Sequence, residues 1–585
     1  MKICLLQATY PEVHVLREID EYPDPGRYIS QHEFHHRFVD KANFRQQIDN
    51  AVSEGFDFIF NFLWGAPEDE VAGVKATEYL ESLNVPFIGY RSHIQMKSKT
   101  EFYETARKRG SSPVPGNNMN SFPVIVKAAR TCASQFMSEK SLCRTEAERD
   151  AAIAEINRQL EPGRVRREAQ KPSSEDAIVY IPREGEHASI DNLPDDIIVQ
   201  EFVPGIDYAV VVIEFGDTPI ALNPIIYTYP NGDVASPDRF LTFDIKFHPE
   251  LDGTLIKRDD DPRLYDTLQQ LAVEAFTVNG NKGGSWGSVD IRIKPDGSPV
   301  VIEVNPMPGI FLPEHMDPKE EVILDSLPGA HRALLNIVFA SCMMQAEQHG
   351  QSRLGKISEA WDMIAPGYEN HKLTHSPAEG EIANLLSKDN FNGSMLDLGC
   401  GSGIFGRMIR EKHASESQGS EAKNARHVGI DISPEMARLA KQAGYDDVII
   451  GPVQECLPRM SEKFDHIIYH QAINFLNTYE VSLVLARCFM LAQKSVTIGV
   501  DEIPDEQNER IKMLPPPMNS LLGINHLQEV EEFGVPKGWE RHSRERYFGW
   551  KSPSTGVDVD EPITGKGQRW QTLNDKGIAV ATATQ

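Results

Sequence analysis

From Ser288 to Asn305 the chain reads Ser-Val-Asp-Ile-Arg-Ile-Lys-Pro-Asp-Gly-Ser-Pro-Val-Val-Ile-Glu-Val-Asn. Two runs that alternate apolar and polar residues flank a Pro-Asp-Gly-Ser turn, a pattern that predicts a β-hairpin. A turn centred between the aspartate and the glycine pairs Asp290 with Glu303. Because alternate residues of a strand share a face, one side of the hairpin should carry four polar residues. These are Asp290, Arg292, Glu303 and Asn305.

The two facing carboxylates of this hairpin suit a metal ion. In this register the Cβ atoms of Asp290 and Glu303 lie roughly 5 Å apart, and two ionised carboxylates at that distance repel unless a cation lies between them. Mg²⁺ takes oxygen ligands and usually completes its shell with nucleotide phosphates. We therefore predict a magnesium site at Asp290, Glu303 and Asn305. The alternative is a solvated face whose acids pair with Arg292 and Lys294.

Further segments precede the hairpin in a recognisable order. Two short strands end in a lysine, a third runs into a Pro-Gly turn, and two apolar segments lie near the start of the chain. They are Phe60–Gly65, Val85–Gly89, the predicted strand Phe122–Lys127, the segment Ile197–Asp207 and the predicted strand Leu241–Lys246. In this order the segments resemble the ATP-grasp enzymes, in particular the D-alanyl-D-alanine ligase-like branch, over about residues 1 to 315.

This resemblance implies an ATP-grasp fold that activates a carboxylate with ATP and Mg²⁺ for attack by an amine. Lysines and Mg²⁺ suit this chemistry because phosphoryl transfer depends on positioning and on neutralising charge. Any one lysine alone would be interpreted as a surface ion-pair residue. The implied roles are phosphate binding by Lys99, Lys127 and Lys246, backbone contacts to adenine from Glu201 and Val203, a place beside the adenine amine for Gln200, ribose binding by Asp207, and metal binding by Asp290, Glu303 and Asn305.

Two positions depart from the family pattern. The loop Ala129–Met137 contains no glycine, although relatives carry a glycine-rich loop over the phosphates. Ser288 stands where these ligases have an arginine that steadies the acyl phosphate. We predict that Arg292, on the same strand face, takes over that catalytic role, and Arg130 is the next candidate.

The second half carries the stretch Ser394–Gly406, in which a buried strand breaks into glycines and opens a helix at Ile404. A doubly wound parallel sheet presents a ligand at such an edge. The glycines at 401, 403 and 406 also satisfy a dinucleotide pattern, so NAD binding stays open. Together with His427–Met436, the sequence Asp397–Gly403 resembles the class I S-adenosylmethionine-dependent methyltransferases, over about residues 356 to 585.

The resemblance implies a Rossmann-like domain in which Asp397, Gly399, Gly401 and Gly403 contact S-adenosylmethionine. It implies that Asp431 accepts hydrogen bonds from the two ribose hydroxyls, whereas the alternative for this residue is a helix N-terminal acid ahead of Ser433.

Two further positions bear on this site. His470 follows the predicted fourth strand of the sheet, Phe464–Tyr469, and is the candidate general base, although many methyl transfers need only proximity. Relatives often have an aspartate for the adenine amine where this chain has Pro452, which leaves Gln454 or Glu455 as stand-ins.

Composition limits the class of protein. The chain has 585 residues, which is longer than a domain with one hydrophobic core usually is. Of these residues, 25% are charged and 40% hydrophobic. A net charge of −27 disfavours a nucleic-acid partner. No apolar run approaches the roughly 18 residues of a membrane span, and the first residues are typical of a strand and not of a signal peptide. The seven scattered cysteines predict reduced thiols, no zinc site and a cytoplasmic location.

We predict a multidomain α/β and α+β chain with an ATP-grasp fold before the methyltransferase. Residues 1–95 form a substrate lobe, 96–190 a lid lobe, 191–347 the nucleotide and metal lobe, 348–355 a linker and 356–585 the methyltransferase. Within these, Thr145–Leu160 has helical spacing, Glu161–Asp191 is expected to be a loop and Ala414–Ala425 is of low complexity. The tail after about Asp558 lacks periodicity, as disordered segments do.

The combined prediction is a bifunctional biosynthetic enzyme that ligates a small-molecule carboxylate and an amine and methylates the substrate or product. Its cofactors are ATP, Mg²⁺ and S-adenosyl-L-methionine, and a homodimer through the ATP-grasp half stays open. The alternatives are a methyltransferase with a degenerate ATP-grasp scaffold, a ligase with a regulatory S-adenosylmethionine-binding domain, and a ligase joined to an NAD-dependent reductase.

Overall fold

The structure is a computed structural model. It describes residues 1–11, 17, 21–65, 71–95, 97–131, 134–169, 193, 196–230, 239–281, 286–306, 308–314, 316–347, 352–368, 372–389, 391–416, 425–500, 503–541, 547–551, 568–573 and 578–583. Much of the predicted loop 161–191, part of the linker 348–355, most of the low-complexity stretch 414–425 and most of the tail lie outside the described residues. The chain forms two compact units, residues 1–214 with 219–326, and residues 215–218 with 327–585.

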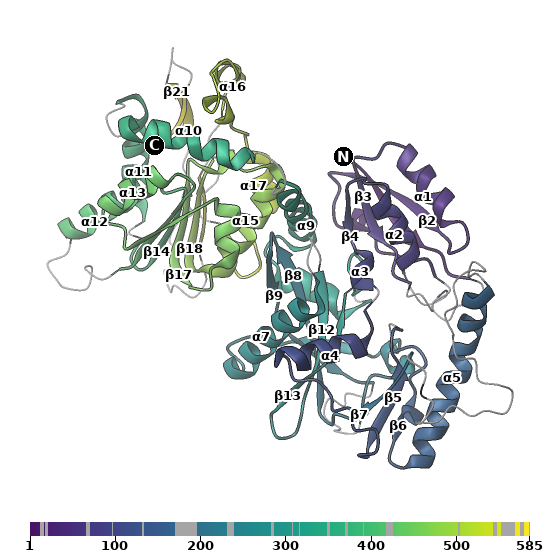
Figure 1. The fold of residues 1–585 in the computed structure, drawn as a ribbon. Coiled ribbons are helices and arrows are strands. Elements are labelled where there is room, and N and C mark those ends of the chain that lie inside the picture. Colours follow the sequence, from purple (N-terminus) through teal and green to yellow (C-terminus); the bar gives the residue numbers. More distant parts are fainter. Residues whose placement is uncertain are drawn as a thin grey trace. The chain divides into compact units, whose positions relative to one another are not determined.

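The first unit begins with a parallel sheet in the order β2-β1-β3-β4 (Figure 1). Alternating strands and helices with buried apolar positions build this lobe, whose core contains Leu6, Ile48 and Leu80. Its elements are β1 (Lys2–Ala8), β2 (Glu33–Val39), α1 (Phe44–Ser53), β3 (Phe58–Phe62), α2 (Val74–Ser82), β4 (Phe87–Gly89) and α3 (Ser92–Gln95).

A small three-stranded antiparallel sheet follows, in the order β6-β5-β7. Its core joins the strands to one long helix through Val126, Ile153 and Val199. The helix was predicted over Thr145–Leu160 and extends further along the chain than that. The elements are β5 (Val124–Ala128), β6 (Leu142–Cys143), α5 (Glu146–Ala169) and β7 (Ile197–Glu201).

The hairpin predicted to bind a metal lies in a six-stranded antiparallel sheet, in the order β11-β10-β8-β12-β13 with β9 beside β8. Helices α4 and α7 pack on it through Phe102, Leu268 and Phe276, which places the start of α4 beside the hairpin. The elements are α4 (Lys99–Arg109), β8 (Ile206–Phe215), β9 (Thr218–Ala221), β10 (Ile225–Thr228), α6 (Phe243–Lys246), β11 (Asp252–Leu255), α7 (Pro262–Asn279), β12 (Trp286–Ile293), β13 (Pro299–Asn305) and α8 (Pro318–Ser326).

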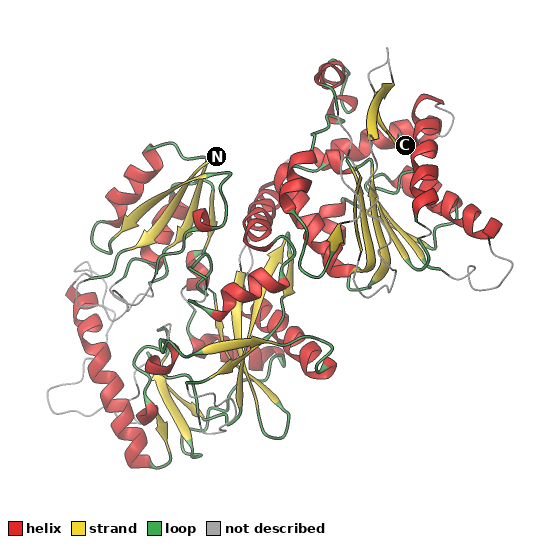
Figure 2. Cartoon of the chain, turned by 180° about the vertical axis from the view of Figure 1, so that it is seen from behind, coloured by secondary structure: helices red, strands yellow, loops and turns green. Residues whose placement is uncertain are grey.

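The second unit contains a seven-stranded sheet in the order β16-β15-β14-β17-β18-β20-β19. The first five strands are parallel, β20 runs antiparallel to β18, β19 runs antiparallel to β20, and helices cover both faces (Figure 2). This arrangement confirms the prediction that Phe464–Tyr469 is the fourth strand along the chain, although the strand includes His470 as well. The strands are β14 (Met395–Leu398), β15 (His427–Asp431), β16 (Asp447–Ile450), β17 (Phe464–His470), β18 (Ala492–Gly499), β19 (Glu540–Arg541) and β20 (Tyr547–Lys551).

The helices of this unit are α9 (Ala330–Glu347), α10 (Arg353–Tyr368), α11 (Lys372–Lys388), α12 (Ile404–Glu416), α13 (Pro434–Gln442), α14 (Val453–Cys456), α15 (Thr478–Leu491), α16 (Asp505–Lys512) and α17 (Leu527–Phe533). Of these, α9 departs from the sequence prediction, which assigned residues 191–347 to the nucleotide lobe. It lies in the second unit because its apolar face packs on α15: the Phe339 and Tyr479 rings are 5.3 Å apart, and Asn336 Nδ2 donates to Ser482 Oγ at 2.9 Å.

Two details complete the second unit. In the predicted disordered tail, β21 (Gln568–Leu573) and β22 (Ile578–Ala583) pair antiparallel, so these residues carry structure. Among the residues that the structure describes, no helix combines the length and apolarity needed to cross a membrane.

Candidate active sites

The predicted hairpin is present, and Asp290 pairs with Glu303 as expected. The register differs nearer the turn, where Lys294 N donates to Ser298 O at 2.9 Å. The predicted turn is therefore wrong by one residue, and a bulge between Asp290 and Ile291 cancels the shift. Two compensating irregularities leave the carboxylate pair where the simple alternation placed it.

One cavity of the first unit gathers most of the predicted ATP-binding residues. Its lining includes Lys99, Lys127, Gln200, Val203, Asp207, Lys246, Asp290, Arg292 and Glu303. Glu201 and Asn305 are not part of this lining. The structure thus brings together residues that lie as far apart in the sequence as Lys99 and Glu303.

The lysines of this cavity surround Glu303. Lys99 Nζ lies 3.1 Å from Glu303 Oε2, and Lys127 Nζ donates to the Tyr103 hydroxyl at 3.2 Å. Burial alone would raise the pKa of Glu303, but Lys99, Lys127 and Lys246 together hold that pKa below its ordinary value. Glu303 therefore stays ionised and ties the cationic cluster to the hairpin.

Asp290 has the opposite environment. Burial, and secondly the neighbouring Glu303, raises the pKa of Asp290. Its Oδ2 accepts from Asn305 Nδ2 at 3.0 Å, whereas its Oδ1 is buried without a hydrogen-bond partner in the described part of the chain. A buried carboxylate oxygen without a partner is costly. The donor set therefore fits Mg²⁺, with Asp290 and Glu303 as ligands, while Asn305 would have to turn its amide oxygen inward.

Lys246 is held differently from the prediction. The segment Leu241–Lys246 was predicted to be a strand, which is wrong: residues Phe243–Lys246 form the short helix α6. Thr242 caps this helix, since its hydroxyl accepts from Ile245 N at 3.3 Å. The lysine still lines the cavity, at the last residue of the helical turn.

The residues predicted to contact adenine are Gln200, Glu201 and Val203. Gln200 is buried, and its Oε1 has no hydrogen-bond partner in the described structure, as an acceptor waiting for an exocyclic amine would. Val203 is buried in the cavity wall. The backbone N–H of Glu201 is already bound to Gly116 O at 2.9 Å, so a backbone contact from this residue to adenine would have to come from its carbonyl.

Arg292 has a partner that the sequence analysis did not identify. In the sheet it faces Asp207 on β8, and its Nε lies 3.2 Å from Asp207 Oδ1. Its Nη2 donates to two loop carbonyls, those of Gly205 and Arg239, and its guanidinium lies over the Phe202 ring. These partners hold the guanidinium beside Asp207, while Arg292 still lines the cavity. Its predicted role in place of the arginine missing at Ser288 stays a prediction.

Asp207, the predicted ribose ligand, already interacts with two residues of the chain. Besides facing Arg292, it accepts a hydrogen bond from the Tyr229 hydroxyl. Burial raises its pKa, and Arg292 opposes that rise. A ribose hydroxyl would have to share this carboxylate with two residues of the chain.

The glycine-free loop reaches the cavity all the same. Thr131, Ser134, Gln135 and Met137 line it, and Ser134 and Phe136 have positive φ of 55° and 66°. Such angles are uncommon outside glycine. The loop therefore adopts a glycine-like path without glycine.

In the second unit, the glycine loop meets the end of β15. Gly399, Gly401 and Gly403 have φ of 65°, 53° and 86°. A Cβ on Gly401 would meet no atom within 4 Å, so this backbone faces open space where a ligand can approach. Asp431 Oδ2 accepts from Gly401 N at 2.8 Å, and its Oδ1 accepts from Ser433 N at 2.9 Å.

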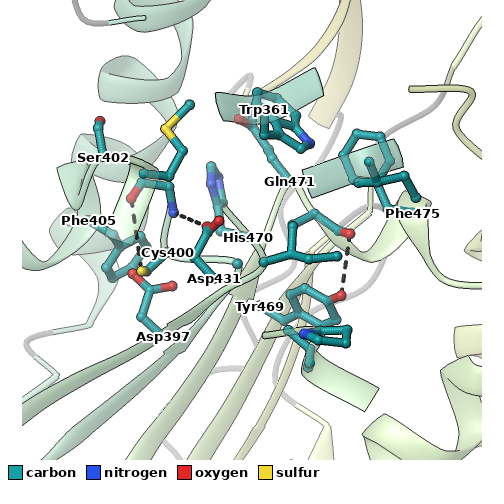
Figure 3. Close-up of a pocket in the computed structure, with 18 of the residues that line it drawn as sticks. Trp361, Asp397, Cys400, Ser402, Phe405, Asp431, Tyr469, His470, Gln471 and Phe475 are labelled. Atoms are coloured by element: carbon teal, nitrogen blue, oxygen red, sulfur yellow. Dashed lines mark hydrogen bonds between the residues drawn. The ribbon is translucent and has the colours of Figure 1, made fainter. Parts of the chain in front are cut away.

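A cavity opens above these residues and is lined by Asp397, Gly399, Gly401, Asp431 and His470 (Figure 3). Asp397 accepts from the Tyr445 hydroxyl. Burial raises the pKa of Asp397 to about 7 and that of Asp431 to about 6. Two acids that gain their charge near neutrality line the cavity, and this suits a cationic ligand.

His470 is joined to an acid that the sequence analysis did not identify. Its Nε2 lies 3.4 Å from Glu381 Oε2, and the same oxygen accepts from Gln471 Nε2 at 2.6 Å. The Glu381 side chain is 2% exposed. Gln471 has a φ of 55°, and strain of this kind gathers at functional sites. One buried carboxylate therefore orients both side chains at the end of β17.

The two sites can now be compared with known proteins. Residues 188–313 match the family model "D-ala D-ala ligase C-terminus", and residues 389–528 match the model "Methyltransferase domain". The two halves resemble two different enzyme families. Two D-alanine–D-alanine ligases match over 123 residues, 21% of this chain and 34% of each relative: that of Cupriavidus taiwanensis is 30% identical and that of Cupriavidus necator 27% identical. The chain thus spans about a third of the length of these relatives.

Solved structures were also compared. The VanG D-Ala:D-Ser ligase from Enterococcus faecalis has a TM-score of 0.37 at 13% identity, covering 58% of this chain and 99% of that one. The magnesium protoporphyrin IX methyltransferase from Synechocystis, solved with bound SAH, has a TM-score of 0.26 at 13% identity, covering 34% of this chain and all of that one.

Helix α10 adds residues to the methyltransferase-like half that the sequence analysis missed. Trp361 lines the cavity and meets the Phe475 ring edge-on at 5.7 Å. Ser358 Oγ donates to Ile432 O at 2.8 Å, which fastens α10 beside Asp431. No motif marked these contacts, because they join segments more than seventy residues apart.

The two candidates for the missing adenine contact separate in the structure. Gln454 lines the cavity and Glu455 does not. Gln454 Nε2 donates to the buried Glu480 at 3.2 Å, and Arg353 Nη2 reaches both oxygens of Glu480 at 3.0 Å. The amide of Gln454 is therefore held in a fixed orientation, which favours it over Glu455.

Proposed function

We propose that the chain is a bifunctional biosynthetic enzyme. Its first unit would join a small-molecule carboxylic acid to an amine with ATP, and its second unit would methylate the substrate or product with S-adenosylmethionine. The observation that carries the ligase proposal is the meeting of Lys99, Lys127 and Lys246 with Asp290 and Glu303 in one cavity.

The ligase reaction would proceed through an acyl phosphate. A carboxylate oxygen attacks the γ-phosphorus of ATP, and the electrons of the broken P–O bond leave with ADP. The amine then attacks the acyl carbon, phosphate departs and the amine loses a proton. Mg²⁺, when bound at Asp290 and Glu303, neutralises charge on the phosphates, and the lysines hold them.

The methyl transfer would use the residues around β14, β15 and β17. S-adenosylmethionine supplies an electrophilic methyl group when bound. Asp431, which already accepts from Gly401 N and Ser433 N, would also accept from the ribose hydroxyls, and the open backbone at Gly401 would let the cofactor approach closely. His470, held by Glu381, would take a proton from the acceptor.

The ligase assignment can be tested at the metal pair. Asp290→Asn and Glu303→Gln should each lower acid- and amine-dependent phosphate release by at least about a hundred-fold, because each removes a charged ligand from the transition state. Asp296→Asn, in the turn of the same hairpin and outside the cavity, is the control. Wild-type turnover in both cavity variants would refute the magnesium site.

Other functions make different forecasts. A degenerate ligase scaffold would release no phosphate with any acid, and a regulatory domain would bind S-adenosylmethionine without transferring its methyl group. An NAD-dependent reductase would be stabilised thermally by NAD and not by S-adenosylhomocysteine. We favour the bifunctional enzyme because charged residues from separate elements meet in both cavities. We expect the enzyme to act in the cytoplasm. Whether it forms a homodimer through the ligase half stays open.

A further inference from the structure

A second cavity of the first unit adjoins the metal pair. It shares Lys99, Thr131 and Glu303 with the nucleotide cavity and includes Asn305. A molecule in this second cavity would meet the metal residues from a side different from that of the nucleotide. If ATP occupies the first cavity, the acid that accepts its γ-phosphoryl group must lie next to these shared residues.

Aromatic side chains build the walls of this cavity away from the metal pair. Trp64, Tyr90 and Phe102 line it, with Ile94 and Pro306 beside them. The Tyr90 ring is fixed by the edge of Trp286, with ring centroids 6.0 Å apart. Fixed aromatic walls favour a flat ring, because aromatic pairs attract beyond the burial of their area.

Two buried polar atoms on this lining are unsatisfied. The Tyr90 hydroxyl and Gln95 Oε1 have no hydrogen-bond partner in the described part of the chain. Gln95 Nε2 already donates to Leu63 O, so the orientation of the amide is fixed and its oxygen can only accept. Unpaired buried groups are rare, and here a ligand that donates a hydrogen bond would satisfy them.

The charges on the lining select further. Among the described residues, Lys97, Lys99 and Arg130 are its basic members and Glu303 is its acid. Glu303 already pairs with Lys99. The charges of this cavity therefore favour the binding of a carboxylate. The ammonium group of a free amino acid would be repelled by the basic residues and would find no unpaired carboxylate among the described lining residues.

We propose that this cavity holds the acid that the first unit activates, and that this acid carries an aromatic ring and an uncharged hydrogen-bond donor. The inference rests on the proposed ligase function and adds the class of its substrate. The carboxylate lies toward Lys99 and the metal pair, and the ring lies between Trp64 and Tyr90.

Calorimetry on the full chain with MgCl₂ and the non-hydrolysable analogue AMP-PNP tests the proposal. The probes are 4-hydroxycinnamate, 3-cyclohexylpropanoate, which lacks an aromatic ring, and phenylalanine, which adds an ammonium group. We expect 4-hydroxycinnamate to bind at least about ten-fold more tightly than either of the others. Trp64→Leu and Tyr90→Phe should each weaken it by about ten-fold.

Tyr79→Phe is the matched control, because its hydroxyl pairs with Asp49 on the surface of the same lobe. Tyr90→Phe removes only one oxygen, so it serves if Trp64→Leu does not fold. The inference is overturned if the three probes bind with equal affinity or if Tyr90→Phe leaves the affinity unchanged. It is also overturned if none of the probes binds to a protein that does bind AMP-PNP. Failure of AMP-PNP itself to bind contradicts the ligase function instead.

Discussion

Asp397 and Asp431 are two buried acids whose charge changes near neutral pH. Burial raises the pKa of Asp397 to about 7 and that of Asp431 to about 6. S-adenosylmethionine carries a sulfonium and an ammonium group, so its binding favours the ionised carboxylates. As the pH falls through these pKa values, the free protein gains protons that the complex must lose, and affinity falls.

We therefore predict that the dissociation constant for S-adenosylmethionine rises by about ten-fold or more between pH 8 and pH 5.5. Asp397→Asn should bind more weakly at pH 8 and show a flatter profile, because one titrating carboxylate is gone. Asp447→Asn, which changes an acid on the surface near Lys441, should keep the wild-type profile. Calorimetry across this pH range distinguishes the outcomes, and a flat wild-type curve would contradict the prediction.

Glu381 lets the role of His470 be tested without touching the histidine. Glu381→Gln keeps the size of the side chain but removes the charge that orients His470 and Gln471. Methyl transfer should fall by about 10- to 100-fold while S-adenosylmethionine affinity stays within about two-fold, since orienting partners typically act on rate by this amount.

The control for this change lies two residues away on the same helix. Glu379 pairs with Arg407 at 3.1 Å and does not line the cavity, so Glu379→Gln should leave transfer unchanged. A rate that is equal in Glu381→Gln and in the unmodified enzyme would show that the acceptor reacts by proximity alone.

Contacts between individual residues could be predicted from the sequence only where the residues lie close together along the chain. Asp290 and Glu303 were found because a local alternation places them opposite each other. Glu381 was missed because it reaches His470 only through the packing of α11, 89 residues upstream in the chain. The pairing of Arg292 with Asp207 was missed because the strand that provides Asp207 is not visible in the hairpin sequence.

At the scale of elements, a six-residue apolar run proved ambiguous. Leu241–Lys246 suits a strand or a helical turn equally, and the Thr242 cap makes it the latter. Elements such as α5 and the strands β14, β15 and β17 of the seven-stranded sheet carried enough pattern to be predicted. The path of the loop before α5 was not predictable, because Ser134 and Phe136 adopt positive φ that their residue types do not announce.

Strand β15 carries a buried histidine that should make the second unit sensitive to acid. His427 is 1% exposed, and neither ring nitrogen has a hydrogen-bond partner in the described part of the chain. Burial, helped by Arg410, lowers the pKa of His427 to about 4. In the unfolded chain the pKa of this histidine is near 6.5. Below that pH the unfolded chain binds a proton at His427 and the folded chain does not, so the free energy of unfolding decreases as the pH falls.

We predict that the free energy of unfolding of the wild type, minus that of His427→Gln, decreases by up to about 3 kcal/mol between pH 7 and pH 4. Taking the difference removes the opposing effect of Asp397 and Asp431, whose raised pKa values favour the folded state in acid. Urea unfolding followed by circular dichroism measures it. A difference that stays constant with pH would mean that His427 is protonated inside the fold.

For the whole molecule, the position of α9 determines where the chain can be divided. The sequence placed the linker at 348–355, whereas the compact units part between Ser326 and Leu327. The buried side of α9 is largely apolar, with Leu334, Ile337 and Phe339 each below 2% exposed, and it also carries Asn336. Composition could not assign this helix, because an apolar face shows that a helix is buried and not which sheet it covers.

We predict that residues 327–585 fold alone and bind S-adenosylhomocysteine, whereas residues 348–585 do not. Removing α9 uncovers the surface of α15 on which it packs, and losing even one buried leucine-sized side chain typically costs about 2–5 kcal/mol. Circular dichroism, thermal melting and calorimetry with S-adenosylhomocysteine on the two fragments compare them directly. As an internal control, Asn336→Ala in the longer fragment removes the hydrogen bond to Ser482 and should cost only about 1 kcal/mol. If 348–585 melts and binds like 327–585, α9 is dispensable to the second unit, and the boundary predicted at 348–355 is the better one.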